Sequence, residues 1–256
     1  MKDLPPVELL NYKVDIEEMR KALDYINSNY KPVLQGSEFG YNNFGGWSLQ
    51  SKSGDYCEGW EMGIESCTKN GVINYNLAKY LKIAHPFEIK EKTEVCSEIF
   101  SNFLDFLENE GFYPRRARIT CLKGNSKSVL HRDAADDVYL CRIHVPLITN
   151  EKCTHRNENV KFHMPADGSV YMLPVNNLHQ ISNDSNEDRY HIIIDAYDTK
   201  KRTKSYQYDK DIEVLINQAI NYRKNIDSVN NGVFRKVIYW IGKNIYKLKF
   251  KLQNKN

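Results

Sequence analysis

Residues 128–147 read SVLHRDAADDVYLCRIHVPL, and the second half of this stretch decides the fold. Side chains two positions apart in a β-strand point the same way. A strand here therefore carries Arg142 and His144 on one face and Ile143 and Val145 on the other. One apolar face and one cationic face predict a sheet packed on both sides, with the cationic face turned into a pocket.

A second segment repeats the pattern. RYHIIIDAY (189–197) places Arg189 and His191 on one face and Ile192 and Ile194 on the other. Buried arginine is costly unless it is paired, and a guanidinium can grip a carboxylate through two parallel hydrogen bonds. Two such faces closed into a small barrel would form a pocket for a dianion. The alternative, arginines on a solvent-facing sheet, is disfavoured by the apolar opposite faces.

The rest of the chain supports a mainly β fold with flanking helices. Helical periodicity covers 15–29 and 91–111, the second with a stripe of Val95, Ile99, Phe103 and Leu107 that ends at Gly111. Period-two segments then follow at 115–122, 138–149, 159–164, 168–174 and 189–197. Several short strands after helices predict a β-sandwich or a jelly roll with helices against it.

Three residues form a candidate metal site. His131 and Asp133 are two apart in an extended segment and can reach one ion from the same side, and His179 in NNLHQISN can supply a third ligand. Two imidazoles and one carboxylate leave positions open, which suits ferrous iron. The helical His-Glu-x-x-His motif of zinc hydrolases is absent from the sequence. A His-x-Asp pair alone is a weak signal.

Several motifs in a fixed order make the signal more specific. They are HRD (131–133), RIHVPL (142–147), FHM with GSVYML (162–173), and HQISN with RYHIIID (179–195). Together they resemble the aspartyl/asparaginyl β-hydroxylase-like family of Fe(II)- and 2-oxoglutarate-dependent oxygenases, nearest the proline cis-4-hydroxylase-like branch. The resemblance covers about 115–197, with a weaker similarity at 40–53.

The resemblance implies a double-stranded β-helix (jelly roll, cupin-like) and roles for six residues. Fe(II) would be held by His131, Asp133 and His179, with O2 as a co-substrate. Arg189 would clamp the far carboxylate of 2-oxoglutarate, and Arg142 and His144 would contact 2-oxoglutarate near its metal-bound end.

The resemblance also bears on the substrate. The vertebrate aspartyl/asparaginyl β-hydroxylases lack the metal carboxylate that Asp133 would supply. This favours a dioxygenase that hydroxylates an unactivated C–H bond of a small carboxylated substrate such as a free amino acid. The six cysteines are scattered and form no Cys-x-x-Cys motif, so we expect a cytoplasmic protein. The alternatives are a hydroxylase of a protein Asp/Asn residue or a natural-product intermediate, and a non-catalytic metal-binding cupin module.

Three further residues are open to two interpretations each. Arg118 either binds substrate carboxylate (or helps to hold 2-oxoglutarate) or belongs to a surface arginine cluster. His163 either lines the pocket or is simply hydrogen-bonded. Trp47 either covers the site or packs in the core, and packing is the default for tryptophan.

The domain plan is an oxygenase domain over 1–200, with its jelly-roll core at about 115–197, followed by a C-terminal helical segment over 201–256. Residues 235–256 hold seven of the 36 Lys/Arg and no Asp/Glu, so the remainder carries 29 basic against 33 acidic residues, a net charge of −4. That balance argues against a nucleic-acid surface on the body. The basic tail is amphipathic. We expect it to pack on the domain, and weak membrane or partner contact is the alternative.

Overall fold

The computed structural model describes residues 7–34, 43–58, 60, 68–69, 72–73, 88–128, 130, 140–174 and 178–198. The expected metal ligands His131 and Asp133, and the expected helical segment 201–256, lie outside these ranges. None of the helices within them is long and apolar enough to cross a membrane.

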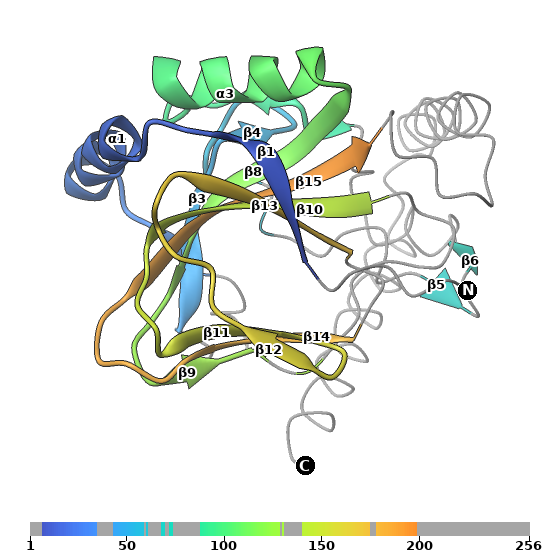
Figure 1. Cartoon of the computed structure of the whole chain (residues 1–256). Helices are drawn as coiled ribbons and strands as arrows, with labels where there is room; N and C mark the ends of the chain where they lie inside the picture. The colour runs from blue at the N-terminus through green and yellow to red at the C-terminus, as the bar shows by residue number, and fades with distance from the viewer. Residues whose placement is uncertain are drawn as a thin grey trace, which may run out of the picture.

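Eight consecutive strands build the core of the molecule. They are β8 (Phe112–Leu122), β9 (Ser126–Lys127), β10 (Leu140–Ile148), β11 (Cys153–Asn157), β12 (Val160–Phe162), β13 (Ser169–Pro174), β14 (His179–Asn183) and β15 (Arg189–Asp198). The larger sheet contains the order β13-β10-β15-β8, and the smaller one has the order β12-β11-β14-β9. Numbered one to eight along the chain, the two sheets read 6-3-8-1 and 5-4-7-2. All pairings are antiparallel, and the sheets face each other (Figure 1). This topology confirms the predicted jelly roll.

Segments before the core widen the larger sheet at both edges. Strand β1 (Glu8–Lys13) pairs with β13, and β3 (Phe44–Ser48) pairs with β8 and with β2 (Val33–Leu34). Two short ribbons join β4 (Gln50–Ser51) to β7 (Glu91–Lys92) and β5 (Thr68–Lys69) to β6 (Val72–Ile73). All five predicted strands are present, within a few residues of their expected ends.

Two helices cover the outer face of the larger sheet (Figure 1). Helix α1 (Ile16–Asn29) begins after Asp15, whose carboxylate accepts a hydrogen bond from the backbone N–H of Glu18 at 3.0 Å. Helix α3 (Glu98–Asn109) is shorter than the predicted 91–111, because Glu91–Lys92 pairs as β7 instead. Gly111, with φ 91°, follows its end as expected.

The predicted stripe on α3 is correct in part. Phe103 and Leu107 are buried in the helix, as expected, but Val95 is buried ahead of it and Ile99 is only partly buried. The buried face of the helix is completed by Phe100 and Leu104.

The outer face of the larger sheet is apolar, as predicted. Ile143, Val145, Ile192 and Ile194 are fully buried and join the helices in one hydrophobic core. Each such side chain contributes about 2 kcal/mol of burial free energy. Because the outer positions are taken by these residues, the alternating positions of the same strands face the smaller sheet. The cationic face is therefore inside the barrel.

Close backbone packing explains the GGW sequence at 45–47. Gly46 has φ 147°, and a Cβ there would lie 1.9 Å from the carbonyl oxygen of Ile119. Trp47 packs in the core, and its Nε1 donates to the backbone oxygen of Tyr30 at 3.1 Å. The packing interpretation of Trp47 is therefore confirmed.

Candidate active site

Three histidines meet inside the barrel. His144 on β10, His155 on β11 and His191 on β15 are all at most 4% exposed. Their ring centroids lie 4.9 Å apart for His144–His155, 5.9 Å for His144–His191 and 6.3 Å for His155–His191. The two sheets bring these residues together because each occupies an inward position of its strand.

The three imidazoles are neutral at pH 7. Burial lowers the pKa of each well below 6.5, and neighbouring positive charges lower it further. Arg189 acts on all three, and His179 acts on His144 and His155. The predicted 2-oxoglutarate clamp and the described member of the predicted metal set therefore both lie near the cluster.

Arg189 is a buried cation with no described carboxylate beside it. It is 1% exposed and forms no ion pair with any acidic residue that the structure describes. Its Nη2 donates to Nδ1 of His191 at 2.7 Å, whereas its buried Nη1 has no hydrogen-bond partner within the described ranges. Burial lowers the pKa of Arg189 to about 9, so it remains charged at neutral pH. Such a group calls for an anionic ligand.

A second group of arginines converges on Asp195. Arg142 Nε donates to Asp195 Oδ1 at 2.8 Å, and Arg118 Nη2 and Arg116 Nη1 lie 3.9 and 4.0 Å from Oδ2. Asp195 is 1% exposed. Arg118 is 6% exposed and stacks over the Trp60 ring at 5.4 Å, which rules out the surface interpretation. Its contact with substrate, and that of Arg142 with 2-oxoglutarate, remain predictions.

His179 is the first residue of β14 and is buried. The chain leading to the HRD segment runs beside this strand. The backbone N–H of Ser128 donates to the oxygen of Ile181 at 2.9 Å, and Gln180 Nε2 donates to the Ser128 oxygen at 2.8 Å. Ser128 precedes His131 by three residues. The described part of the fold therefore places Ser128 alongside the strand of His179.

The family comparison agrees with this geometry. Residues 75–199 match the model of the aspartyl/asparaginyl beta-hydroxylase family. The match covers just under half of the chain, including all of the jelly-roll strands. The match confirms the resemblance drawn from the motifs, and it makes the chain a hydroxylase.

Three solved structures are similar to this chain at low sequence identity. An oxidoreductase of the 2OG-Fe(II) oxygenase family from Burkholderia pseudomallei is 12% identical with a TM-score of 0.47, covering 77% of this chain and 89% of that one. A prolyl hydroxylase from Trichoplax adhaerens, solved with a hypoxia inducible factor peptide, is 13% identical with a TM-score of 0.34, covering 75% and 97%. A viral collagen prolyl hydroxylase from Paramecium bursaria Chlorella virus-1 is 14% identical with a TM-score of 0.31, covering 41% and 72%.

His155 is the residue of the hydroxylase barrel that sequence reasoning missed. Its strand, CTHRN, buries Cys153, His155 and Asn157 and leaves the two residues between them more exposed. This alternation is the signal that could have found it. The segment is short and polar, however, and it lacks the β-branched run that marks the other strands.

His163 forms an ordinary structural hydrogen bond. Its Nδ1 lies 2.9 Å from the backbone oxygen of Cys153. This supports the interpretation of His163 as a simply hydrogen-bonded residue. A contact between His163 and substrate remains a prediction.

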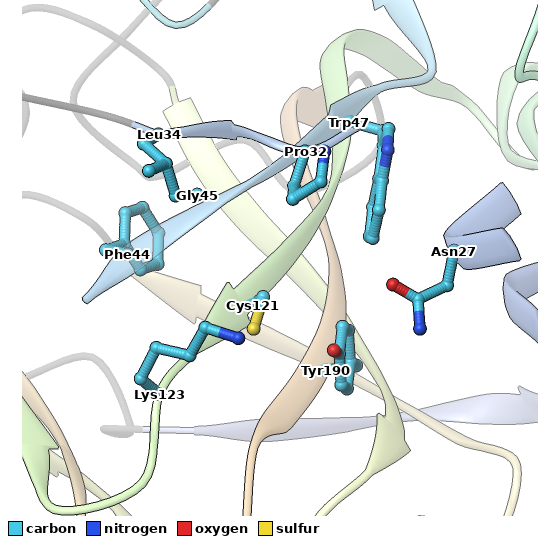
Figure 2. Close-up of a pocket in the computed structure, with 9 residues that line it drawn as sticks. All are labelled: Asn27, Pro32, Leu34, Phe44, Gly45, Trp47, Cys121, Lys123 and Tyr190. Carbon is cyan, nitrogen blue, oxygen red and sulfur yellow. The ribbon is translucent and has the colours of Figure 1, made fainter. Parts of the chain in front are cut away.

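A surface hollow of the hydroxylase lies elsewhere (Figure 2). Its lining includes Trp47, Cys121, Lys123 and Tyr190. Tyr190 occupies the outer face of β15, opposite to Arg189 and its inward neighbours, and Lys123 is paired with Asp188 at 2.6 Å. The hollow is therefore outside the barrel and is not the candidate active site.

Proposed function

We propose that this hydroxylase is an Fe(II)- and 2-oxoglutarate-dependent dioxygenase. It hydroxylates an unactivated C–H bond of a small carboxylated substrate such as a free amino acid. The observation that carries the proposal is Arg189, a buried guanidinium whose Nη1 has no hydrogen-bond partner in the described ranges. A carboxylate at this end of the barrel would pair the charge and satisfy the donor.

The barrel residues fit 2-oxoglutarate. Arg189 would bind its far carboxylate, and His144 and Arg142 would contact its other end. Neutral imidazoles around the site can donate hydrogen bonds without adding further buried charge. His131, Asp133 and His179 would hold the iron. When bound, iron with 2-oxoglutarate and O2 supplies the oxidant for C–H hydroxylation, with succinate and CO2 as by-products.

The group around Asp195 supports a carboxylated substrate. The buried Asp195 carboxylate accepts a hydrogen bond from Arg142 and lies within 4.0 Å of the guanidinium groups of Arg118 and Arg116. Arg118 is our candidate for the residue that binds the substrate carboxylate. A protein Asp/Asn residue and a natural-product intermediate are the alternative substrates.

A non-catalytic metal-binding module is the rival from another class. Such a module would require the metal set but not a buried cation ten residues after His179. Arg189 Nη1, which has no hydrogen-bond partner among the described residues, therefore favours the enzyme.

The test is an anaerobic titration of the Fe(II)-loaded protein with 2-oxoglutarate, followed by a screen of amino acids for succinate release in air. We expect a weak visible charge-transfer band on titration, and succinate release that increases with the correct substrate. Absence of both the band and any 2-oxoglutarate binding would refute the proposal. Binding without turnover of any carboxylated small molecule would move the substrate to the protein or natural-product class.

A further inference from the structure

A buried amide lies directly across from His179 on the neighbouring strand. Asn157 of β11 is the cross-strand partner of His179 on β14. One residue outside this pair, the backbone N–H of Glu158 donates to the oxygen of Leu178 at 2.7 Å, so the pair is of the non-hydrogen-bonded type. Side chains are closest in pairs of this type, with Cβ atoms about 4.5–5.5 Å apart. The side chains of Asn157 and His179 are therefore neighbours on one face of the smaller sheet.

Glu158 fixes the start of β14 against the end of β11. It adopts φ 49°, and its Oε1 accepts a hydrogen bond from the backbone N–H of Leu178 at 2.8 Å. Leu178 immediately precedes His179, so one residue holds both the N–H and the oxygen of the peptide unit before the predicted metal ligand. The backbone of His179 is thus positioned, and the rotation of its imidazole ring is left for another group to fix.

The amide of Asn157 has an acceptor to spare. Asn157 is 0% exposed, and its Nδ2 donates to the backbone oxygen of Pro174 at 3.4 Å. A carbonyl oxygen can only accept, so this contact assigns the nitrogen to one side of the amide and the oxygen to the other. Among the residues that the structure describes, Oδ1 has no hydrogen-bond partner. An unsatisfied buried acceptor costs about 1–3 kcal/mol, which indicates that a donor joins it in the working protein.

We propose that Asn157 is a positioning residue for the metal, and that its Oδ1 accepts a hydrogen bond from Nδ1–H of His179 when His179 binds the metal through Nε2. This inference rests on the proposed function. Metal binding at Nε2 leaves the proton of a neutral imidazole on Nδ1, so it creates a donor beside the spare acceptor. A histidine that binds metal nearly always donates its other ring N–H to a protein acceptor, which fixes the orientation of the ring.

The lengths of the two side chains suit this hydrogen bond. Nδ1 and Oδ1 are each two bonds from their own Cβ atoms, which is the reach needed across a close cross-strand pair. Nε2 is on the far side of the ring from Nδ1, so a ring held in this way directs Nε2 away from Asn157 and toward the metal. The bond requires a rotation of the His179 side chain, because Oδ1 has no partner in the described structure.

Two substitutions separate the acceptor from the rest of the amide. Asn157→Leu keeps the approximate size of the side chain and removes both Oδ1 and Nδ2. Asn157→Asp keeps an acceptor oxygen and loses only the donor to Pro174. The matched control is Cys153→Ser, at a buried position of the same strand whose cross-strand partner is Asn183 rather than His179.

The measurement is the affinity for Zn(II), which stands in for Fe(II), determined by competition with a chelator at pH 7.5. We expect Asn157→Leu to bind Zn(II) about 10–100-fold more weakly than the wild type. Asn157→Asp should retain most of the wild-type affinity, because a carboxylate oxygen takes the place of Oδ1. Cys153→Ser should match the wild type. Thermal melts of the metal-free proteins check that each variant is folded.

The imidazole proton gives a readout that does not depend on any variant. In 15N-labelled wild-type protein loaded with Zn(II), the His179 ring should carry its proton on Nδ1, at the downfield shift of a hydrogen-bonded N–H. A proton on Nε2, an Nδ1–H at the shift of an unbonded group, equal affinities for Asn157→Leu and wild type, or equal losses in both Asn157 variants would each overturn the inference. Failure of the wild type itself to bind a divalent metal would refute the proposed function instead.

Discussion

Replacing Arg189 with methionine should abolish 2-oxoglutarate binding without destabilising the unliganded protein. A guanidinium ordinarily titrates above pH 12, and burial lowers the pKa of Arg189 to about 9. At about 1.4 kcal/mol for each pKa unit, the burial of this charge opposes folding by roughly 4 kcal/mol at pH 7. A lowered pKa means that the charged form of Arg189 is less stable in the folded protein than in water, so its charge destabilises the folded state at pH 7.

Methionine removes this charge and roughly preserves the apolar length of the side chain. The substitution also removes the hydrogen bond from Nη2 and leaves His191 Nδ1 unpaired, which costs about 1–3 kcal/mol of stability. The shorter side chain adds a smaller packing cost. We expect the free energy of unfolding of Arg189→Met to exceed that of the wild type by zero to about 2 kcal/mol. Most substitutions at buried positions lower it instead.

The assay is urea denaturation of the metal-free protein without 2-oxoglutarate, paired with calorimetric titration of the Zn(II)-loaded form. Arg156→Met is the matched control, because Arg156 is exposed on β11 and its Nε donates to a backbone oxygen at 2.8 Å. The control should bind 2-oxoglutarate normally. If Arg189→Met loses more than about 2 kcal/mol of stability and still binds 2-oxoglutarate normally, Arg189 is a structural residue and the reasoning is wrong.

Three further predictions concern the metal set, the arginine hub and the pH dependence. Asp133→Ala should abolish turnover and weaken Fe(II) binding while circular dichroism shows the fold intact, and full activity would refute the ligand assignment. Asp195→Asn should lower the free energy of unfolding, measured by urea denaturation, by about 3–5 kcal/mol, because it leaves the guanidinium of Arg142 without its buried carboxylate partner. An unchanged free energy of unfolding would contradict this. The three barrel histidines have pKa values lowered well below 6.5, so their contribution to stability is present above pH 6.5 and falls as the pH drops below it. The stability measured by urea denaturation should be lower at pH 5.5 than at pH 7.5 by up to about 4 kcal/mol in total, and this loss should be reduced by about a third in His155→Leu.

The strands whose alternation is carried by β-branched residues were predictable from the sequence. On β10 and β15 one apolar face and one polar face follow directly from the order of residues, and this alternation alone places Arg142, His144 and Arg189 inside the barrel. The fold assigned by strand order is the predicted jelly roll. Strand β11 was missed because its inward residues are polar, and His155 was missed with it.

Pairing across strands could not be predicted from the sequence. Asp195 continues the inward alternation of RYHIIID, but its role depends on the register that sets it opposite Arg142. That register follows from the packing of two distant segments, so no local pattern contains it. The hydrogen bond between Arg189 and His191 lies within one strand and depends on how the two side chains turn, so the sequence predicted only their shared face.

The two arginine groups lie at different places along one strand, and this ordering argues for the proposed reaction. Arg189 opens β15 and Asp195 follows six residues later, a separation of about 20 Å along an extended strand. Near the C-terminal end of β15, Asp195 offsets the positive charges of the three arginines around it. At the N-terminal end, Arg189 has no described acidic residue beside it. His179 influences the pKa of His144 and His155, as Arg189 does. Under the proposed function, 2-oxoglutarate held at Arg189 and a metal held at His179 would both border the histidine cluster, and Arg118 beside Asp195 would bind the substrate carboxylate.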